Sequence, residues 1–204
     1  MNKANPVDPF VVLKGEHELL FGVLDSLECC IATVDRGADP RDLRRFVEFL
    51  RGFLSAWHWP KEDDILFRAL ASSGFPANSG PLAVLDEDHR EIERLLTKAA
   101  AYTANGGPAG GDALRFTLRV LRSLDALLRY HLEMEETVLF ETAARELPET
   151  KIAELGEAMQ VFLDDARGSF RYHSLRRMAD RLQADFLPAN RRRVALAGCA
   201  AASL

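Results

Sequence analysis

The sequence predicts an all-α protein, an antiparallel up-down four-helix bundle with two additional C-terminal helices. Three observations lead to this class. Apolar residues recur at steps of three and four over long stretches, which is the spacing of one face of an α-helix. The alternating patterns typical of β-strands are nearly missing. Prolines and glycines divide the chain into segments of helical length, because proline opens helices and glycine–proline turns end them.

These punctuation residues bound each predicted helix. Pro9 opens a first helix that ends near Gly37, and Pro40 opens a second that ends before the turn at 72–76. The third predicted helix runs from Pro81 to the Asn-Gly-Gly-Pro sequence at 105–108, and the fourth runs from about Asp112 to Pro148. We also expect a helix up to Leu163, a break at Gly168-Ser169 and a last helix that ends at Pro188.

The chain therefore divides into a bundle at 1–147, a helical extension at 148–188 and a tail at 189–204, which we expect to be flexible. Each bundle helix has an apolar seam that contains one histidine: His17, His58, His89 or His131. The predicted core positions are 13, 17, 20, 24, 27, 31 and 34; then 43, 47, 50, 54, 58, 62, 65 and 69; then 82, 85, 89, 92, 96 and 99; and finally 114, 121, 124, 128, 131, 135, 138 and 142.

Composition excludes several classes of protein. A chain of 204 residues with 48% hydrophobic content can bury a real core. Its net charge of −5 gives no electrostatic case for nucleic acid, and the arginines at 191–193 are typical of a solvated terminus. No run reaches the roughly 20 apolar residues that span a bilayer, and the start lacks a secretory signal, so we expect a cytoplasmic protein without membrane partners. Cys29, Cys30 and Cys199 follow no disulfide or zinc spacing.

A ten-residue sequence occurs twice. The stretch HWPKEDDILF at 58–67 returns 73 residues later as HLEMEETVLF at 131–140, and both copies share His, Glu four residues on, a second acid and a final Leu-Phe. His and Glu at i and i+4 lie one above the other on one helix face. The first histidines repeat as well, since His17 precedes His58 by 41 residues and His89 precedes His131 by 42. Each half is therefore a helical hairpin that offers one His and one His-x-x-x-Glu.

This repeat predicts a metal centre in the bundle core. Glu62 and Glu135 share the apolar seams, and an unpaired carboxylate in a core costs several kcal/mol unless it is protonated, paired or bound to a cation. Two hairpins that close a bundle with pseudo-twofold symmetry place two similar ligand sets on one axis. For any single residue of this group, a hydrogen-bonded histidine in a structural core or a surface glutamate is the better explanation. That explanation does not account for four histidines and two glutamates together. We therefore predict a binuclear site.

The two ten-residue copies resemble the His-x-x-x-Glu-Glu-x-x-Leu-Phe signature of the hemerythrin-like (HHE cation-binding) family, and the resemblance covers about residues 10–145. It implies a non-haem centre of two Fe ions with an oxo or hydroxo bridge, although Mn or Zn can occupy such donors. His17 and His58 would serve one iron, His89 and His131 the other, and Glu62 and Glu135 would bridge both. Coordination positions remain for an exogenous ligand.

The chain departs from the animal oxygen carriers that resemble it. Those proteins use a fifth histidine one turn from the first on the third helix, where this chain has Leu85 and Glu93 on either side of His89. We expect Glu93 or water to fill that position as an additional ligand. Pro60 predicts a local kink beside the site. Five acids flank the ligands and are candidates to orient the imidazole rings: Glu16, Asp63, Asp88, Glu133 and Glu136.

The resemblance implies a cytosolic di-iron protein that binds O2 or another small diatomic ligand, for storage, sensing or detoxification. Two alternatives stay open: a di-iron enzyme that acts on peroxide or nitric oxide, and a redox- or iron-sensing interaction protein. Steady turnover that is lost in His131→Ala would favour the enzyme. A change of oligomer or partner between oxidised and reduced protein would favour the sensor, in which the C-terminal helices bind a second copy or another protein.

Overall fold

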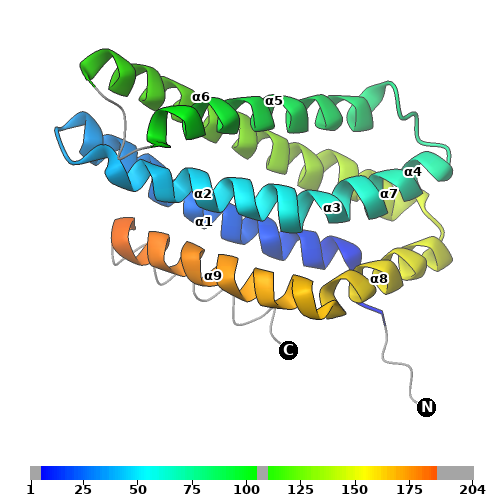
Figure 1. Cartoon of the computed structure of the whole chain (residues 1–204). Helices are drawn as coiled ribbons and strands as arrows, with labels where there is room; N and C mark the ends of the chain where they lie inside the picture. Colours follow the sequence, from blue (N-terminus) through cyan, green and yellow to red (C-terminus); the bar gives the residue numbers. More distant parts are fainter. Residues whose placement is uncertain (1–5, 105–109, 188–204) are drawn as a thin grey trace.

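The computed structural model describes residues 6–104 and 110–187, and within them the chain is helical without strands. The predicted tail, its cysteine and arginines, and the predicted turn at 105–108 lie outside the described residues. The helices lie in layers (Figure 1). The first helix is α1 (Pro9–Asp35). The second is a continuous helical rod of several segments: η1 (Pro40–Asp42), α2 (Leu43–Phe53), η2 (Leu54–His58), α3 (Trp59–Lys61), η3 (Glu62–Phe67) and α4 (Arg68–Ser72). The third helix is α5 (Gly80–Thr103), and the fourth rod consists of α6 (Gly111–Met134), η5 (Glu135–Leu139) and α7 (Phe140–Glu146), followed by α8 (Glu149–Asp164) and α9 (Ala166–Phe186).

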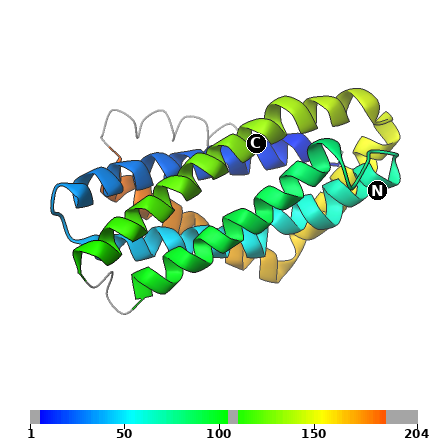
Figure 2. The ribbon, with the colours of Figure 1, turned by 90° about the horizontal axis from the view of Figure 1, so that it is seen from above.

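The long helices form the predicted up-down bundle. Figure 2 shows α5 and α6 side by side above α1 and the second rod. The predicted start of α1 is confirmed, because Pro9 is the first helical residue and the Asp8 carboxylate accepts hydrogen bonds from the amides of Phe10 at 2.9 Å and Val11 at 3.2 Å. Such a cap contributes about 1 kcal/mol to helix stability. Gly37 follows the end of α1 with φ +96, a conformation that favours glycine.

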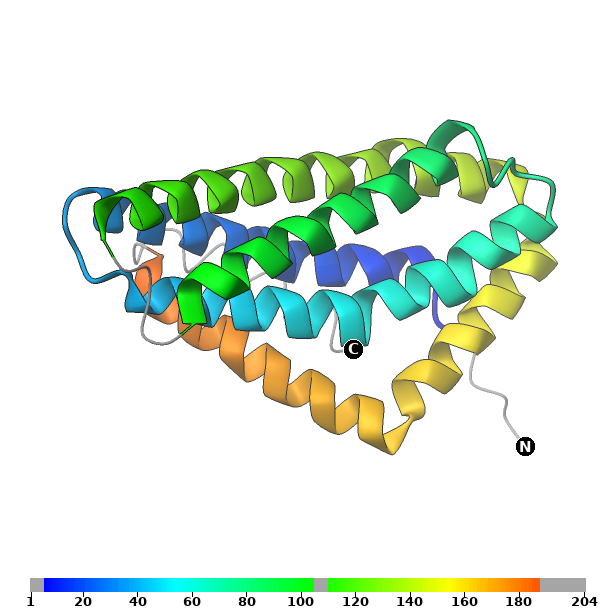
Figure 3. The same cartoon turned by 45° about the horizontal axis from the view of Figure 1, so that its top comes forward.

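The two C-terminal helices pack on the bundle. Figure 3 shows α8 and α9 as a V along one side of it, with α9 against α1 and α2. Buried residues of α9, Leu175 and Leu182 among them, belong to the same apolar cluster as the bundle core. The predicted break at Gly168-Ser169 is wrong: the chain turns at Asp165, whose φ −59 and ψ 116 are extended, and α9 begins at Ala166. A glycine costs a helix only about 1 kcal/mol, which is too little to end it.

Three segments of the rods are π-helical, and they change which residues face the core. In η2 the Trp59 amide donates to the Leu54 carbonyl five residues earlier, directly before the predicted kink at Pro60, which has no amide hydrogen to donate. The other two, η3 and η5, begin at Glu62 and at Glu135. A π-helical turn inserts one extra residue and is frequent at functional sites.

The extra residue moves the apolar seam by one position in both rods. Apart from Leu114, which is partly buried, the seams are buried as predicted through Glu62 and Glu135. The next predicted positions, 65, 69, 138 and 142, are only partly buried. The core instead contains their C-terminal neighbours, which are 0–1% exposed: Leu66, Leu70, Leu139 and Ala143. The prediction was wrong at these four positions because it assumed an unbroken α-helix.

The core consists of two apolar clusters. The larger one lies around Leu24, Leu50 and Leu124, and the smaller one lies around Leu13, Leu66 and Leu139. Along every bundle helix a buried polar segment separates the two clusters. Among the described residues, no helix is long and apolar enough to cross a membrane.

Candidate metal centre

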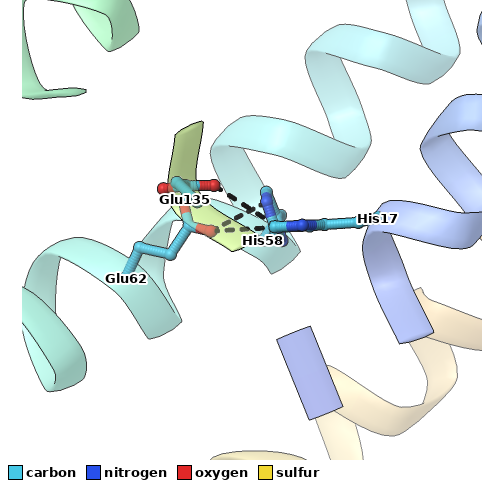
Figure 4. Close-up of side chains that lie close together, drawn as sticks. All are labelled: His17, His58, Glu62 and Glu135. Carbon is cyan, nitrogen blue, oxygen red and sulfur yellow. Dashed lines mark ion pairs between the residues drawn. The ribbon is translucent and has the colours of Figure 1, made fainter. Parts of the chain in front are cut away.

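Six polar side chains converge in the layer between the two apolar clusters. One histidine comes from each helical rod of the bundle, and one glutamate comes from each of the second and fourth rods. Five of the six are 0% exposed and His89 is 6% exposed: His17, His58, Glu62, His89, His131 and Glu135. Figure 4 shows four of them pointing toward one another: His17 from α1, His58 and Glu62 from the second rod, and Glu135 from the fourth rod. The sequence repeat therefore becomes a single buried cluster.

The cluster contains two groups whose donor atoms all lie within 4.8 Å of one another. One group is His17, His58, Glu62 and Glu135, and the other is His89, His131, Glu62 and Glu135. Both glutamates belong to both groups. Glu62 Oε1 lies 2.9 Å from His58 Nε2, and its Oε2 lies 3.4 Å from His89 Nε2. Each glutamate thus faces both halves of the repeat.

Most of the inward atoms lack the hydrogen bonds that burial normally demands. Both carboxylate oxygens of Glu62 and of Glu135 have no hydrogen-bond partner, and neither does Nε2 of His17 or His58. An unsatisfied buried polar group costs about 1–3 kcal/mol, and more when it is charged. Neutral imidazole nitrogens and carboxylate oxygens are the donors that first-row transition metals accept. A divalent cation at this point would satisfy all of these atoms together, so the residues fit a metal.

Carboxylates hold the outer nitrogens of the rings. The Nδ1–H of His17 donates to Glu136 at 3.0 Å, that of His58 donates to Glu16 at 2.9 Å, and that of His89 donates to Asp63 at 3.1 Å. His131 Nδ1 lies 3.5 Å from Asp88 Oδ2. A carboxylate on Nδ1 fixes the tautomer that directs the Nε2 lone pair inward and raises the basicity of that nitrogen. Of the five flanking acids, Glu133 is the one without a ring contact, and its side chain is exposed.

These outer contacts repeat with the pseudo-twofold symmetry. The acid before the first histidine of each half supports the second histidine of the same half, which pairs Glu16 with His58 and Asp88 with His131. The acid after Glu62 or Glu135 instead supports the first histidine of the opposite half: Asp63 contacts His89 and Glu136 contacts His17. The second acid of the ten-residue repeat therefore links the two hairpins.

Charge and burial shift the pKa values of the metal-free site. Burial opposes the charge of Glu62, but the positive charge of His58 and the adjacent rings of His17 and His89 hold its pKa well below the ordinary range. Burial and the charge of Glu62 raise the pKa of Glu135 well above its ordinary value. Against burial, Glu62 and Glu16 raise the pKa of His58 to about 9, and Asp63 and Glu62 do the same for His89. Burial lowers the pKa of His131, and the charge of His89 lowers it further. Without metal, the site therefore holds protons.

The structure does not bring Glu93 to the site. Its side chain is exposed on α5, and it belongs to neither donor group. The inward seam continues from His89 to Ile92, a step of three, and this rotates Glu93 outward. Leu85, one turn before His89, is an apolar core residue. His173 on α9 is exposed, as its place outside the repeats predicts.

Sequence reasoning missed a fully buried lysine beside the site. Lys61 is 0% exposed, and its Nζ lies 3.1 Å from Glu16 Oε1. Trp57 Nε1–H donates to the same carboxylate at 2.8 Å. Glu16 thus joins His58 to a tryptophan and a lysine. The only sequence signal was the position of Lys61 next to Glu62, because residues adjacent to a seam can enter the core when a π-helical turn is near.

The fold and the donor set define a metal-binding helical-bundle protein. Residues 8–143 match the model of the Hemerythrin HHE cation binding domain, which covers two-thirds of the chain. The chain belongs to the hemerythrin HHE cation-binding family. No curated protein and no solved structure matches it.

Proposed function

We propose that this chain is a cytosolic non-haem di-iron protein that binds O2 or another small diatomic ligand. The observation that carries the proposal is the pair of donor groups that share Glu62 and Glu135. A mononuclear site does not need two glutamates that each face two pairs of histidines. Two adjacent cations, by contrast, would each use one pair of histidines and share the two glutamates.

In this proposal each half of the repeat serves one ion. His17 and His58 would hold the first iron, His89 and His131 would hold the second, and Glu62 and Glu135 would be shared between them. The six side chains would supply about eight of the roughly twelve positions of two six-coordinate ions, which would leave room for an exogenous ligand. Mixed imidazole and carboxylate donors favour iron, with manganese chemically close. When bound, the ion pair supplies redox chemistry and open coordination positions.

The protein's own residues prepare and enclose this site. The carboxylates on Nδ1 hold three imidazole rings in the tautomer that a metal requires. Apolar clusters on both sides exclude water. Because all six donors are 0–6% exposed, a large substrate has no direct path to them, whereas a diatomic molecule can pass between packed side chains. Burial therefore supports a diatomic ligand over a larger substrate.

Elemental mass spectrometry tests the proposal. Full-length protein purified without a nickel column should contain about two iron ions per chain, and the Glu62→Ala/Glu135→Ala variant should contain none. Glu141→Ala is a matched control, because Glu141 is an exposed glutamate on α7 whose side chain is 67% exposed. No transition metal after iron reconstitution would show that the cluster is only a bundle core.

Ligand chemistry separates the leading function from the enzymatic alternative. The reduced, iron-loaded protein should bind O2 or nitric oxide in stoichiometric amounts, with a change in the visible spectrum that His131→Ala abolishes. Continuous consumption of peroxide or nitric oxide by the loaded protein would instead support an enzyme.

A further inference from the structure

Lys61 is a buried cation beside the candidate metal centre. Its Nζ contacts the Glu16 carboxylate at 3.1 Å and donates to the Trp57 carbonyl. The same nitrogen lies 4.2 Å from the centre of the Trp57 ring and 4.6 Å from that of Phe162 on α8. Carboxylate, carbonyl and aromatic faces all stabilise an ammonium. Lysine is almost never fully buried without such partners, so this arrangement needs an explanation.

The other half of the repeat has no equivalent cation. With the offset of 73 residues, Lys61 corresponds to Met134 and Trp57 corresponds to Tyr130, which is 53% exposed. Glu16 corresponds to Asp88, since each precedes the first histidine of its half. Whereas Glu16 is shared by Lys61, Trp57 and His58, Asp88 Oδ2 has no hydrogen-bond partner among the described residues. The pseudo-twofold symmetry of the ligands is therefore broken in their supports.

The difference changes how strongly each pair of histidines can donate to a cation. A carboxylate on Nδ1 increases the basicity of Nε2. Glu16 divides its negative charge among His58, Lys61 and Trp57, so the ammonium reduces the support that this carboxylate gives to His58. The ammonium also repels a nearby cation directly, and this interaction is strong in a buried site of low dielectric constant. Both effects weaken the half-site of His17 and His58.

We propose that Lys61 makes the two metal positions unequal, so that a divalent cation binds first and more tightly to the half-site of His89 and His131. This inference rests on the proposed metal-binding function. Lys61 acts through Glu16 and His58 as a positioning residue. The phenyl ring of Phe162 covers the ammonium, so the C-terminal helices help to maintain the asymmetry.

A Co²⁺ titration of the metal-free, full-length protein tests the order of binding. Visible absorption and calorimetry should resolve two steps whose affinities differ by roughly ten- to hundredfold, the effect typical of a support behind a ligand. His131→Ala should remove the tight step, and His58→Ala should remove the weak one. Equal affinities in the unaltered protein would overturn the inference.

Lys61→Met tests the cause, because methionine is the residue at the corresponding position of the other half. It should increase the affinity of the weaker Co²⁺ binding step about tenfold or more, which reduces the difference in affinity between the two steps. It should also change the visible spectrum of Co²⁺ bound in the second step. The control is Lys14→Met, which removes a lysine whose side chain is 42% exposed and paired with Glu141, and should leave both steps unchanged.

A second variant keeps the inference falsifiable if Lys61→Met does not fold. Asp88→Asn changes a carboxylate that is 17% exposed. It should weaken the tighter Co²⁺ binding step and so reduce the difference in affinity between the two steps. Two unequal steps that neither Lys61→Met nor Asp88→Asn alters would overturn the inference and leave the proposed function intact. A protein that binds no Co²⁺ would overturn both.

Discussion

Replacement of Glu135 by methionine should stabilise the metal-free protein. In the absence of metal this side chain is 0% exposed, and neither carboxylate oxygen has a hydrogen-bond partner. Methionine has a similar length and no polar group to desolvate. Removal of a buried, unsatisfied carboxyl group that faces Glu62 should raise the free energy of unfolding by about 2–4 kcal/mol. For a chain of this size, the melting temperature should rise by about 2–4 °C for each kcal/mol.

The gain should depend on pH in a defined direction. Folding raises the pKa of Glu135 above its ordinary 4.5, so the folded state holds a proton that the unfolded state releases. In the unaltered protein, the contribution of Glu135 to the free energy of unfolding is fully present below pH 4.5. This contribution is lost as the pH rises toward the raised pKa of the folded state. The advantage of Glu135→Met should therefore be smallest near pH 4.5 and should grow toward neutral pH.

Urea unfolding of metal-free protein at several pH values measures the change in the free energy of unfolding. Elemental analysis of iron-reconstituted samples measures the loss of bound metal. The variant should be more stable without metal, yet it should bind fewer ions. Glu141→Met is the control, because that exposed glutamate should change stability by no more than about 0.5 kcal/mol. If Glu135→Met were less stable than the parent at neutral pH, the carboxyl group would have a structural role and the reasoning would be refuted.

Three further predictions concern the site and its surroundings. Metal binding should release protons at pH 7.5, and the apparent affinity for metal should rise as the pH approaches 9. The reason is that His58 and His89 hold protons below pH 9, whereas a metal requires neutral imidazole. Calorimetry in buffers of different ionisation enthalpy counts the released protons. Gly156→Ala should cost about 1–3 kcal/mol in urea unfolding, since a Cβ would lie 2.2 Å from the Val7 carbonyl oxygen. Glu93→Ala should change neither metal content nor stability, and a loss of iron would show that this exposed side chain reaches the site.

The π-helical turns show where sequence periodicity stops being informative. Apart from the partly buried Leu114, steps of three and four located the core correctly up to Glu62 and Glu135, because those steps describe an α-helix. Each π-helical turn then adds one residue, so that Leu66 and Leu139 are buried in place of Ile65 and Val138. The identity of the core residue after such a turn depends on how the backbone hydrogen bonds shift, and heptad spacing contains no term for that shift.

The sequence-based prediction of the site was wrong in two ways. It placed Glu93 at the site, and it did not anticipate the burial of Lys61 beside it. Spacing placed Glu93 one turn from His89, but the rotation of α5 directs Ile92 inward instead. Lys61 looked like an ordinary polar residue in sequence, and it became buried because Glu16 of α1 and Phe162 of α8 meet it from distant parts of the chain. Such contacts between helices far apart in sequence cannot be read from local patterns.

The sequence by itself determined the helical class, the places where the bundle helices begin, and the convergence of a repeated His-x-x-x-Glu with two further histidines. Local physics suffices for these features, since proline, glycine and apolar spacing act within a few residues. Only the tertiary structure decided which carboxylate supports which ring, how Asp63 and Glu136 cross between the hairpins, and why one half alone contains a buried cation. These features depend on packing between helices, which brings together side chains from distant parts of the chain.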